Sequence, residues 1–167
     1  MDVRLFLALW PDEAIRRQLV QARDSWRWPR SASPVADAKL HLTLNFLGSV
    51  DEERLPELEA AFDVPFTPFE VELGRPVVWH RSIAVLEPLS VPPELIELHT
   101  LLDERVAALG LPVEERAYKP HVTMARRAGN ATPPERIAPL QWNVAGYALV
   151  QSKLGAGAEY GVVRAYR

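Results

Sequence analysis

The stretch "HLTLNFLG", residues 41–48, places a histidine and a threonine two positions apart in an otherwise apolar run, and the pattern returns at residues 121–128 as "HVTMARRA". Side chains of a strand alternate between its two faces, so His41 and Thr43 share one face while the intervening leucines point the other way. We expect the leucine face, with Phe46 on it, to be core. The histidine face is then free to carry chemistry.

Bulk composition is typical of a globular domain. With 167 residues of which 48% are hydrophobic, the chain is expected to form a single domain over residues 1–167, or two intimately packed half-size lobes. A net charge of −3 argues against a broad basic surface for long nucleic acids but not against binding a short phosphorylated end. The absence of cysteine excludes disulfides and thiolate metal sites and is compatible with the cytoplasm, where we expect the protein. No apolar run approaches the roughly 18 residues of a membrane span, so we expect no membrane association.

The order of predicted elements occurs twice. Strand-like runs at residues 4–10 and 82–88 each lead into a segment with helical spacing of its apolar residues, at 11–26 and 92–110. In each half a loop and a histidine-containing strand then follow. A pseudo-two-fold relation would bring the equivalent faces of the two histidine strands together.

The remaining segments predict one more helix and three more strands. The helix would start at a capping box in which Ser49 answers Glu52, although Pro56 suggests a late start of its regular part. Strands and helices without regular parallel βαβ spacing favour an α+β fold with mainly antiparallel sheets. These segments are residues 49–62 (helix), 69–79, 146–154 and 160–167 (strands), and 155–159 (turn).

Two histidines facing one another suit displacement at phosphorus. An imidazole with a pKa of about 6.5 gives or takes a proton near neutrality. One histidine deprotonates the attacking oxygen while the other protonates the leaving oxygen, and the two threonine hydroxyls donate to the non-bridging oxygens. We expect no metal and no cofactor, because two histidines without cysteine are too few for zinc and neither "GxGxxG" nor "GxxxxGK" occurs.

A structural interpretation competes with this one. Two half-buried strands whose histidines make satisfied hydrogen bonds would show the same residues, and for either pair alone that interpretation is the better one. The repetition of the pair favours a site. The other two histidines, His80 and His99, lie off the apolar pattern, and we expect both on the solvated surface.

These residues resemble the two-histidine phosphoesterase superfamily, and specifically its RNA 2′,3′-cyclic phosphodiesterase branch, also named RNA 2′-5′ ligase. The likeness runs from "RLFLALWPDEAIRRQL" through "LHLTLNFLG" and "KPHVTMARR" to "ALVQSKLGAGAEYGVV". It implies a bilobal, duplicated α+β fold with two mainly antiparallel sheets framing a central groove and helices on the outside. It also implies a monomeric enzyme, without cofactor, that hydrolyses the 2′,3′-cyclic phosphate at RNA 3′ ends to a 2′-phosphate.

The resemblance assigns roles to the four motif side chains. His41 would be the proton donor to the departing ribose O3′, and His121 the proton acceptor that activates water. Thr43 and Thr123 would hold the phosphate.

Arg126 falls where the resemblance implies a phosphate-contacting arginine, five positions after His121. Strict alternation sends its side chain to the opposite face. The role therefore requires the strand to end or bulge near Ala125.

Three other functions remain open from the sequence. The first is joining of tRNA-half-like RNA ends through a 2′-5′ linkage, which is the same chemistry run backwards with a 5′-hydroxyl in place of water. The second is hydrolysis of small cyclic nucleotides. The third is non-catalytic binding of RNA ends, which the intact pair of motifs disfavours because binding needs no proton-transfer groups.

Overall fold

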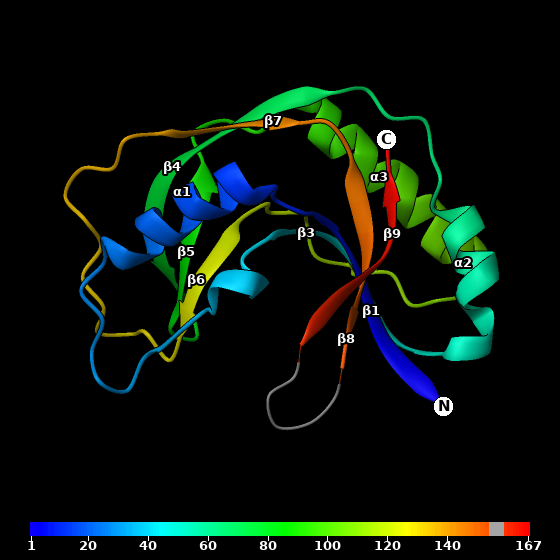
Figure 1. Ribbon diagram of the computed structural model, residues 1–167, viewed down its shortest axis with the longest axis horizontal. Coiled ribbons are helices and arrows are strands. Elements are labelled where there is room, and N and C mark those ends of the chain that lie inside the picture. The colour runs from blue at the N-terminus through cyan, green and yellow to red at the C-terminus, as the bar shows by residue number, and fades with distance from the viewer. Residues whose placement is uncertain (154–158) are drawn as a thin grey trace.

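The computed structural model describes residues 1–153 and 159–167 (Figure 1). It has the predicted α+β class, with three helices against a curled antiparallel sheet. The strands are β1 (Asp2–Leu9), β2 (Ser33–Pro34), β3 (Leu42–Asp51), β4 (Phe69–Trp79), β5 (Ile83–Pro88), β6 (Val122–Arg126), β7 (Leu140–Val144), β8 (Tyr147–Ser152) and β9 (Tyr160–Tyr166), and the helices are α1 (Glu13–Asp24), α2 (Leu55–Ala61) and α3 (Pro93–Ala108).

The strands form one sheet in the order β7-β4-β5-β6-β3-β1-β8-β9, with β2 added beside β6. The prediction of two sheets is wrong, because all the described strands belong to one sheet. The two histidine strands, β3 and β6, are the inner edges of two four-stranded halves, and they pair antiparallel through Leu42 and Val122. This pairing satisfies backbone groups that two free edges would leave exposed.

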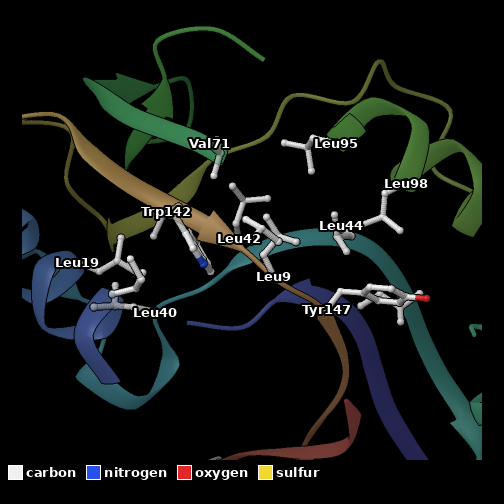
Figure 2. Packing of buried hydrophobic residues seen from close by; sticks show 14 of the residues in the cluster. Leu9, Leu19, Leu40, Leu42, Leu44, Val71, Leu95, Leu98, Trp142 and Tyr147 are labelled. Atoms are coloured by element: carbon white, nitrogen blue, oxygen red, sulfur yellow. The ribbon is translucent and has the colours of Figure 1, made fainter. Parts of the chain in front are cut away.

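Each of the two long helices packs against the half of the sheet opposite to the strand that precedes it in the chain. α1 follows β1 yet packs against β7 in the other half, and α3 follows β5 yet packs against β3. Figure 2 shows the result: Leu19 of α1 lies on the side of Trp142, whereas Leu98 of α3 lies beside Leu44. Because all four residues belong to one continuous core, neither half closes its core alone. No helix in the described ranges is long and apolar enough to cross a bilayer.

Local signals predicted some element ends and missed others. Asp12 lies at the start of the predicted helical segment 11–26 and caps α1, accepting a hydrogen bond from the Ile15 amide at 2.8 Å. The capping box at Ser49 is wrong, because pairing with β1 keeps β3 extended through Asp51, and α2 begins only at Leu55. Strand β7 was not predicted, although its alternating apolar residues carried the signal. The turn expected at 155–159 falls largely on 154–158, outside the described residues.

Candidate active site

The two faces of the sheet bury different clusters. The face under the helices carries the main core, which includes Leu42 and Leu44. The opposite face carries a smaller cluster centred on Phe6 in β1, with Trp10 and Tyr160 packed at its margin. We call this second face the site face, because both motif histidines lie on it.

The two histidines occupy equivalent places and have equivalent bonds. Each stands immediately before the first residue of its strand, β3 or β6. The His41 Nδ1 lies 2.6 Å from the Lys39 carbonyl oxygen, and the His121 Nδ1 lies 2.9 Å from that of Lys119. A carbonyl only accepts, so each Nδ1 carries a hydrogen and each neutral ring keeps Nε2 as its proton acceptor.

The register between β3 and β6 brings the two motifs together. Leu42 of β3 is paired with Val122 of β6. If this register is extended by one residue in each direction, His41 lies opposite Thr123 and Thr43 lies opposite His121. Cross-strand neighbours share a face, and diagonal ones lie roughly 7–8 Å apart. In this extended register the two histidines are diagonal neighbours, an arrangement suited to one phosphate between their imidazoles.

A bulge in β3 changes which side chains reach the site face. Thr43 pairs with Ala8 and Asn45 with Leu7, which leaves Leu44 without a partner on β1. The extra residue shifts the alternation. Phe46 is therefore 67% exposed and pairs with Phe6 on the site face, and its prediction as a core residue is wrong.

A matching bulge in β6 shifts the alternation of side chains before Arg126. The partners of Thr123 and Ala125 on β5 are consecutive residues, so Met124 is the extra residue, three positions after His121 just as Leu44 follows His41. Arg126 is exposed, and its positive charge adds to the larger effect of burial in lowering the pKa of both motif histidines. The alternation that opposed a role for Arg126 is thus interrupted one residue before Ala125.

Aromatic side chains surround the His41 ring. Its ring centroid is 4.8 Å from that of Phe6, 5.9 Å from the nearly parallel Trp10 and 5.7 Å from the edge-on Tyr160. Its Nε2 is 2.9 Å from the Thr43 hydroxyl oxygen. Burial among these rings is the largest cause that lowers the pKa of His41, to about 4, and the positive charges nearby add to it.

The environment of His121 is more polar than that of His41. Trp79 packs on it at 4.3 Å between ring centroids and donates its indole N–H to Glu87 at 2.8 Å. Lys119 Nζ lies 3.4 Å from the same carboxylate. Burial lowers the pKa of His121, while the hydrogen bond to Lys119 and the Glu87 charge oppose that change. Sequence reasoning missed both Trp79 and Glu87, since neither belongs to a motif.

The other two histidines differ from each other. His80 is exposed, as expected. The prediction of a solvated His99 is wrong, because its side chain is only 15% exposed and stacks on Tyr118 with ring centroids 3.9 Å apart.

A buried polar network holds the bulge of β3 in place. The Tyr118 hydroxyl donates to the Thr43 carbonyl at 2.8 Å, and the His99 Nδ1–H donates to the Leu44 carbonyl at 2.8 Å. The other His99 nitrogen lies 3.2 Å from Asp103. Since Tyr118 precedes the second motif by three residues, this network ties the first motif to the second.

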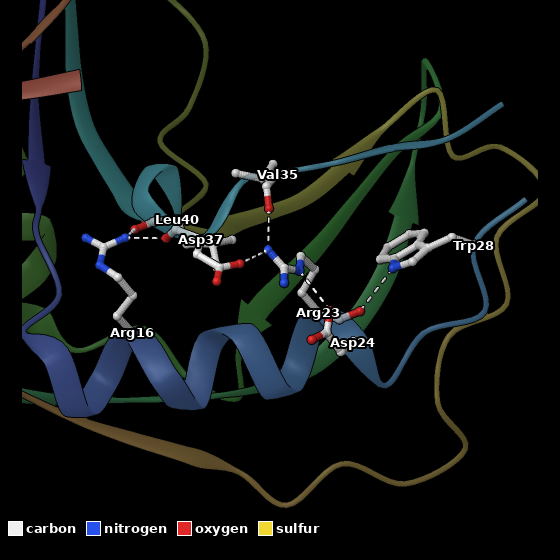
Figure 3. Close-up of polar contacts among 7 residues, drawn as sticks. All are labelled: Arg16, Arg23, Asp24, Trp28, Val35, Asp37 and Leu40. Carbon is white, nitrogen blue, oxygen red and sulfur yellow. Dashed lines mark hydrogen bonds and ion pairs between the residues drawn. The ribbon is translucent and has the colours of Figure 1, made fainter. Parts of the chain in front are cut away.

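The segment before the first motif is clamped to α1 (Figure 3). Arg23 donates to the Val35 carbonyl at 2.7 Å and to the Asp37 carboxylate at 2.6 Å. Arg16 donates to the Asp37 carbonyl at 2.6 Å and the Leu40 carbonyl at 3.1 Å. The backbone that enters His41 is therefore held by helix side chains.

Comparison with known proteins gives matches over most of the chain. A family model described as the 2′-5′ RNA ligase superfamily matches residues 11–154. A Thermus thermophilus protein named RNA 2′,3′-cyclic phosphodiesterase is 36% identical over 169 residues, covering 91% of this chain and 83% of that protein. An Escherichia coli protein of the same name is 35% identical over 130 residues, covering 77% and 74%. The crystal structure of E. coli LigT complexed with 3′-AMP has a TM-score of 0.83 and 29% identity, covering 99% of this chain and 97% of LigT.

Proposed function

The chain belongs to the 2′-5′ RNA ligase superfamily, and we propose that it hydrolyses terminal RNA 2′,3′-cyclic phosphate to a 2′-phosphate by metal-independent two-histidine catalysis. Relatives named RNA 2′,3′-cyclic phosphodiesterase occur in both bacteria and archaea, and the similarity to them identifies this protein as an enzyme of that class. The observation that carries the mechanism is the β3–β6 register, which sets two His-x-Thr pairs against each other on one face.

The proposed step moves two protons across one phosphorus. His121 Nε2 takes a proton from water as the water oxygen bonds to phosphorus. The bond from phosphorus to O3′ breaks, and protonated His41 gives its Nε2 proton to that oxygen. The product keeps its phosphate on O2′. The hydrogen bonds from each Nδ1 to a backbone carbonyl support these roles, because they leave Nε2 as the nitrogen that can exchange a proton with the substrate or water.

Thr43, Thr123 and Arg126 are proposed to hold the phosphate. Both threonines lie on the site face beside a histidine, and hydroxyl donors stabilise the charge on the non-bridging oxygens. The β6 bulge and the influence of Arg126 on both histidines support the same role for the guanidinium.

We also infer that residues 1–167 form one domain of two pseudo-symmetric lobes around a central groove. The strand order supports this, because reading outward from the centre gives β3-β1-β8-β9 on one side and β6-β5-β4-β7 on the other. Bulges at equivalent positions after each histidine support it too. Both histidines come from one chain, so a monomer contains the whole proposed site.

The first test is a product assay. The protein should convert an oligoribonucleotide 2′,3′-cyclic phosphate to the 2′-phosphate in the presence of EDTA, as followed by phosphorus NMR. Among the described residues no three His, Cys, Asp or Glu side chains are placed to hold a metal ion. Loss of turnover in chelator, with recovery on adding zinc or manganese, would overturn the metal-free mechanism. A parallel reaction with tRNA-like halves would favour the ligase alternative if joined product outlasted hydrolysis.

The pH profile is the second test. With His41 required in its protonated form and His121 as the neutral base, kcat/KM depends on the pKa values of the free enzyme, and both lie below 6.5. We expect kcat/KM to peak below pH 6.5 and to fall as pH rises, because protonated His41 becomes scarce. A bound phosphate anion raises both pKa values, so the kcat profile should lie at higher pH than the kcat/KM profile. A kcat/KM optimum above pH 7 would contradict the lowered pKa of His41.

A further inference from the structure

One end of the molecule brings together segments that are rich in arginine and free of acidic residues. Three segments meet there: residues 26–34 before the first motif, the turn at 79–83 between β4 and β5, and residues 125–132 at the end of β6. None of these segments contains Asp or Glu. They carry five exposed arginines, which we call the arginine track: Arg27, Arg30, Arg81, Arg126 and Arg127.

Hydrogen bonds join the three segments side by side. β2 pairs with the end of β6. The Ala128 amide donates to the Ser82 carbonyl at 2.7 Å, which fixes the turn beside the end of β6. Arg27 and Thr132 form a two-way backbone bridge with bonds of 3.0 and 3.1 Å. In Figure 1 these segments gather at the lower left.

The charge of the track is uncompensated. Within residues 1–153 and 159–167, none of its five arginines takes part in an ion pair, whereas Arg23, Arg54 and Arg116 each pair with a carboxylate. The opposite end, around α2 and α3, is acidic: segments 51–63 and 94–104 hold ten Asp and Glu residues and a single arginine. The net charge of −3 therefore hides a strongly polarised molecule.

The track is continuous with the candidate active site through Arg126, whose charge reaches both motif histidines. A 2′,3′-cyclic phosphate stands at the 3′ end of an RNA, so the rest of the strand leaves the site in one direction only. Its phosphates are repelled by the acidic end and attracted by the arginine end.

We propose that the arginine track binds the backbone phosphates of the RNA strand immediately upstream of the cyclic phosphate. The inference rests on the proposed function and extends it, because it selects the 3′ end of an RNA chain over a free cyclic nucleotide as the better substrate. Contacts of this kind position the strand without reading its sequence.

The test compares an oligoribonucleotide 2′,3′-cyclic phosphate with a 2′,3′-cyclic mononucleotide over a range of salt concentrations. The oligonucleotide should have the higher kcat/KM at low salt and the steeper salt dependence, by about 0.7 in log–log slope for each phosphate contact. The triple variant Arg27→Gln, Arg30→Gln, Arg81→Gln should lose about 10- to 100-fold on the oligonucleotide at ~50 mM salt and show a flatter slope. Its kcat/KM on the mononucleotide should not change.

Two matched variants separate charge from other effects. Lysine at the same three positions keeps the charge and should retain most of the oligonucleotide preference. Arg116→Gln removes an exposed arginine that lies outside the three track segments and should leave the kinetics on both substrates unchanged. Equal kcat/KM and equal salt slopes for the two substrates, or unchanged oligonucleotide kinetics in the triple variant, would overturn the track while leaving the proposed function intact.

Failure to hydrolyse either substrate would instead contradict the proposed function. The track then has its own test, which is binding of a fluorescent oligoribonucleotide 2′-phosphate measured by anisotropy. Salt-sensitive binding that weakens in the glutamine variant and not in the lysine variant would support the track. Binding unaffected by either set of substitutions would refute it.

Discussion

Replacing either His41 or His121 by alanine should lower kcat by about 10²- to 10⁴-fold, because each imidazole transfers a proton in the same displacement. The double variant should lose clearly less than the product of the two single losses, since groups that act as a unit are not additive. His80→Ala is the matched control, as this histidine is exposed and off the motifs. Near-normal turnover in either single variant would rule out the two-histidine mechanism.

The leaving group tells the two histidines apart. A 4-nitrophenyl phosphodiester loses an oxygen that needs little protonation, so it should rescue His41→Ala far more than His121→Ala. Equal rescue would leave the pair catalytic but its donor and acceptor unassigned. Rescue of His121→Ala alone would exchange the two roles.

Replacing Arg126 by alanine should lower kcat/KM on a cyclic mononucleotide by about 10²- to 10³-fold, the usual cost of removing one donor from a transition-state anion. The side chain is exposed, so the fold and the thermal melting temperature should be retained. Arg126→Lys should recover part of the loss, since a charge remains but the planar fork of donors is gone.

Arg127→Gln is the matched control for Arg126, because it is an adjacent exposed arginine on the same track. It should leave mononucleotide kinetics unchanged. Equal kinetics in wild type and Arg126→Ala would show that the guanidinium does not act on the reacting phosphate despite the β6 bulge.

Much of the candidate site was predictable from local pattern. A period of two predicted that His41 and Thr43 share a face, and the repeat eighty residues later predicted a second, equivalent pair. The duplicated order of strand, helix and histidine strand also held in the structure. These features depend on residues close to one another in the chain, where alternation and helical spacing suffice.

The tertiary structure decided the rest. Bulges at Leu44 and Met124 shift the alternation of side chains before Phe46 and Arg126, and a bulge depends on which residues the neighbouring strand supplies. His99 became part of a buried network for a similar reason, since it meets a β3 carbonyl across the core.

The sequence by itself determined the α+β class, the two motifs and the chemistry that their imidazoles and hydroxyls allow. Only the tertiary structure decided that the two halves share one sheet, that each long helix covers the opposite half, and that the arginines of three distant segments gather at one end. The physical reason is range. Local periodicity assigns each side chain to a face, whereas pairing partners, bulges and summed charge arise from contacts between residues far apart in the chain.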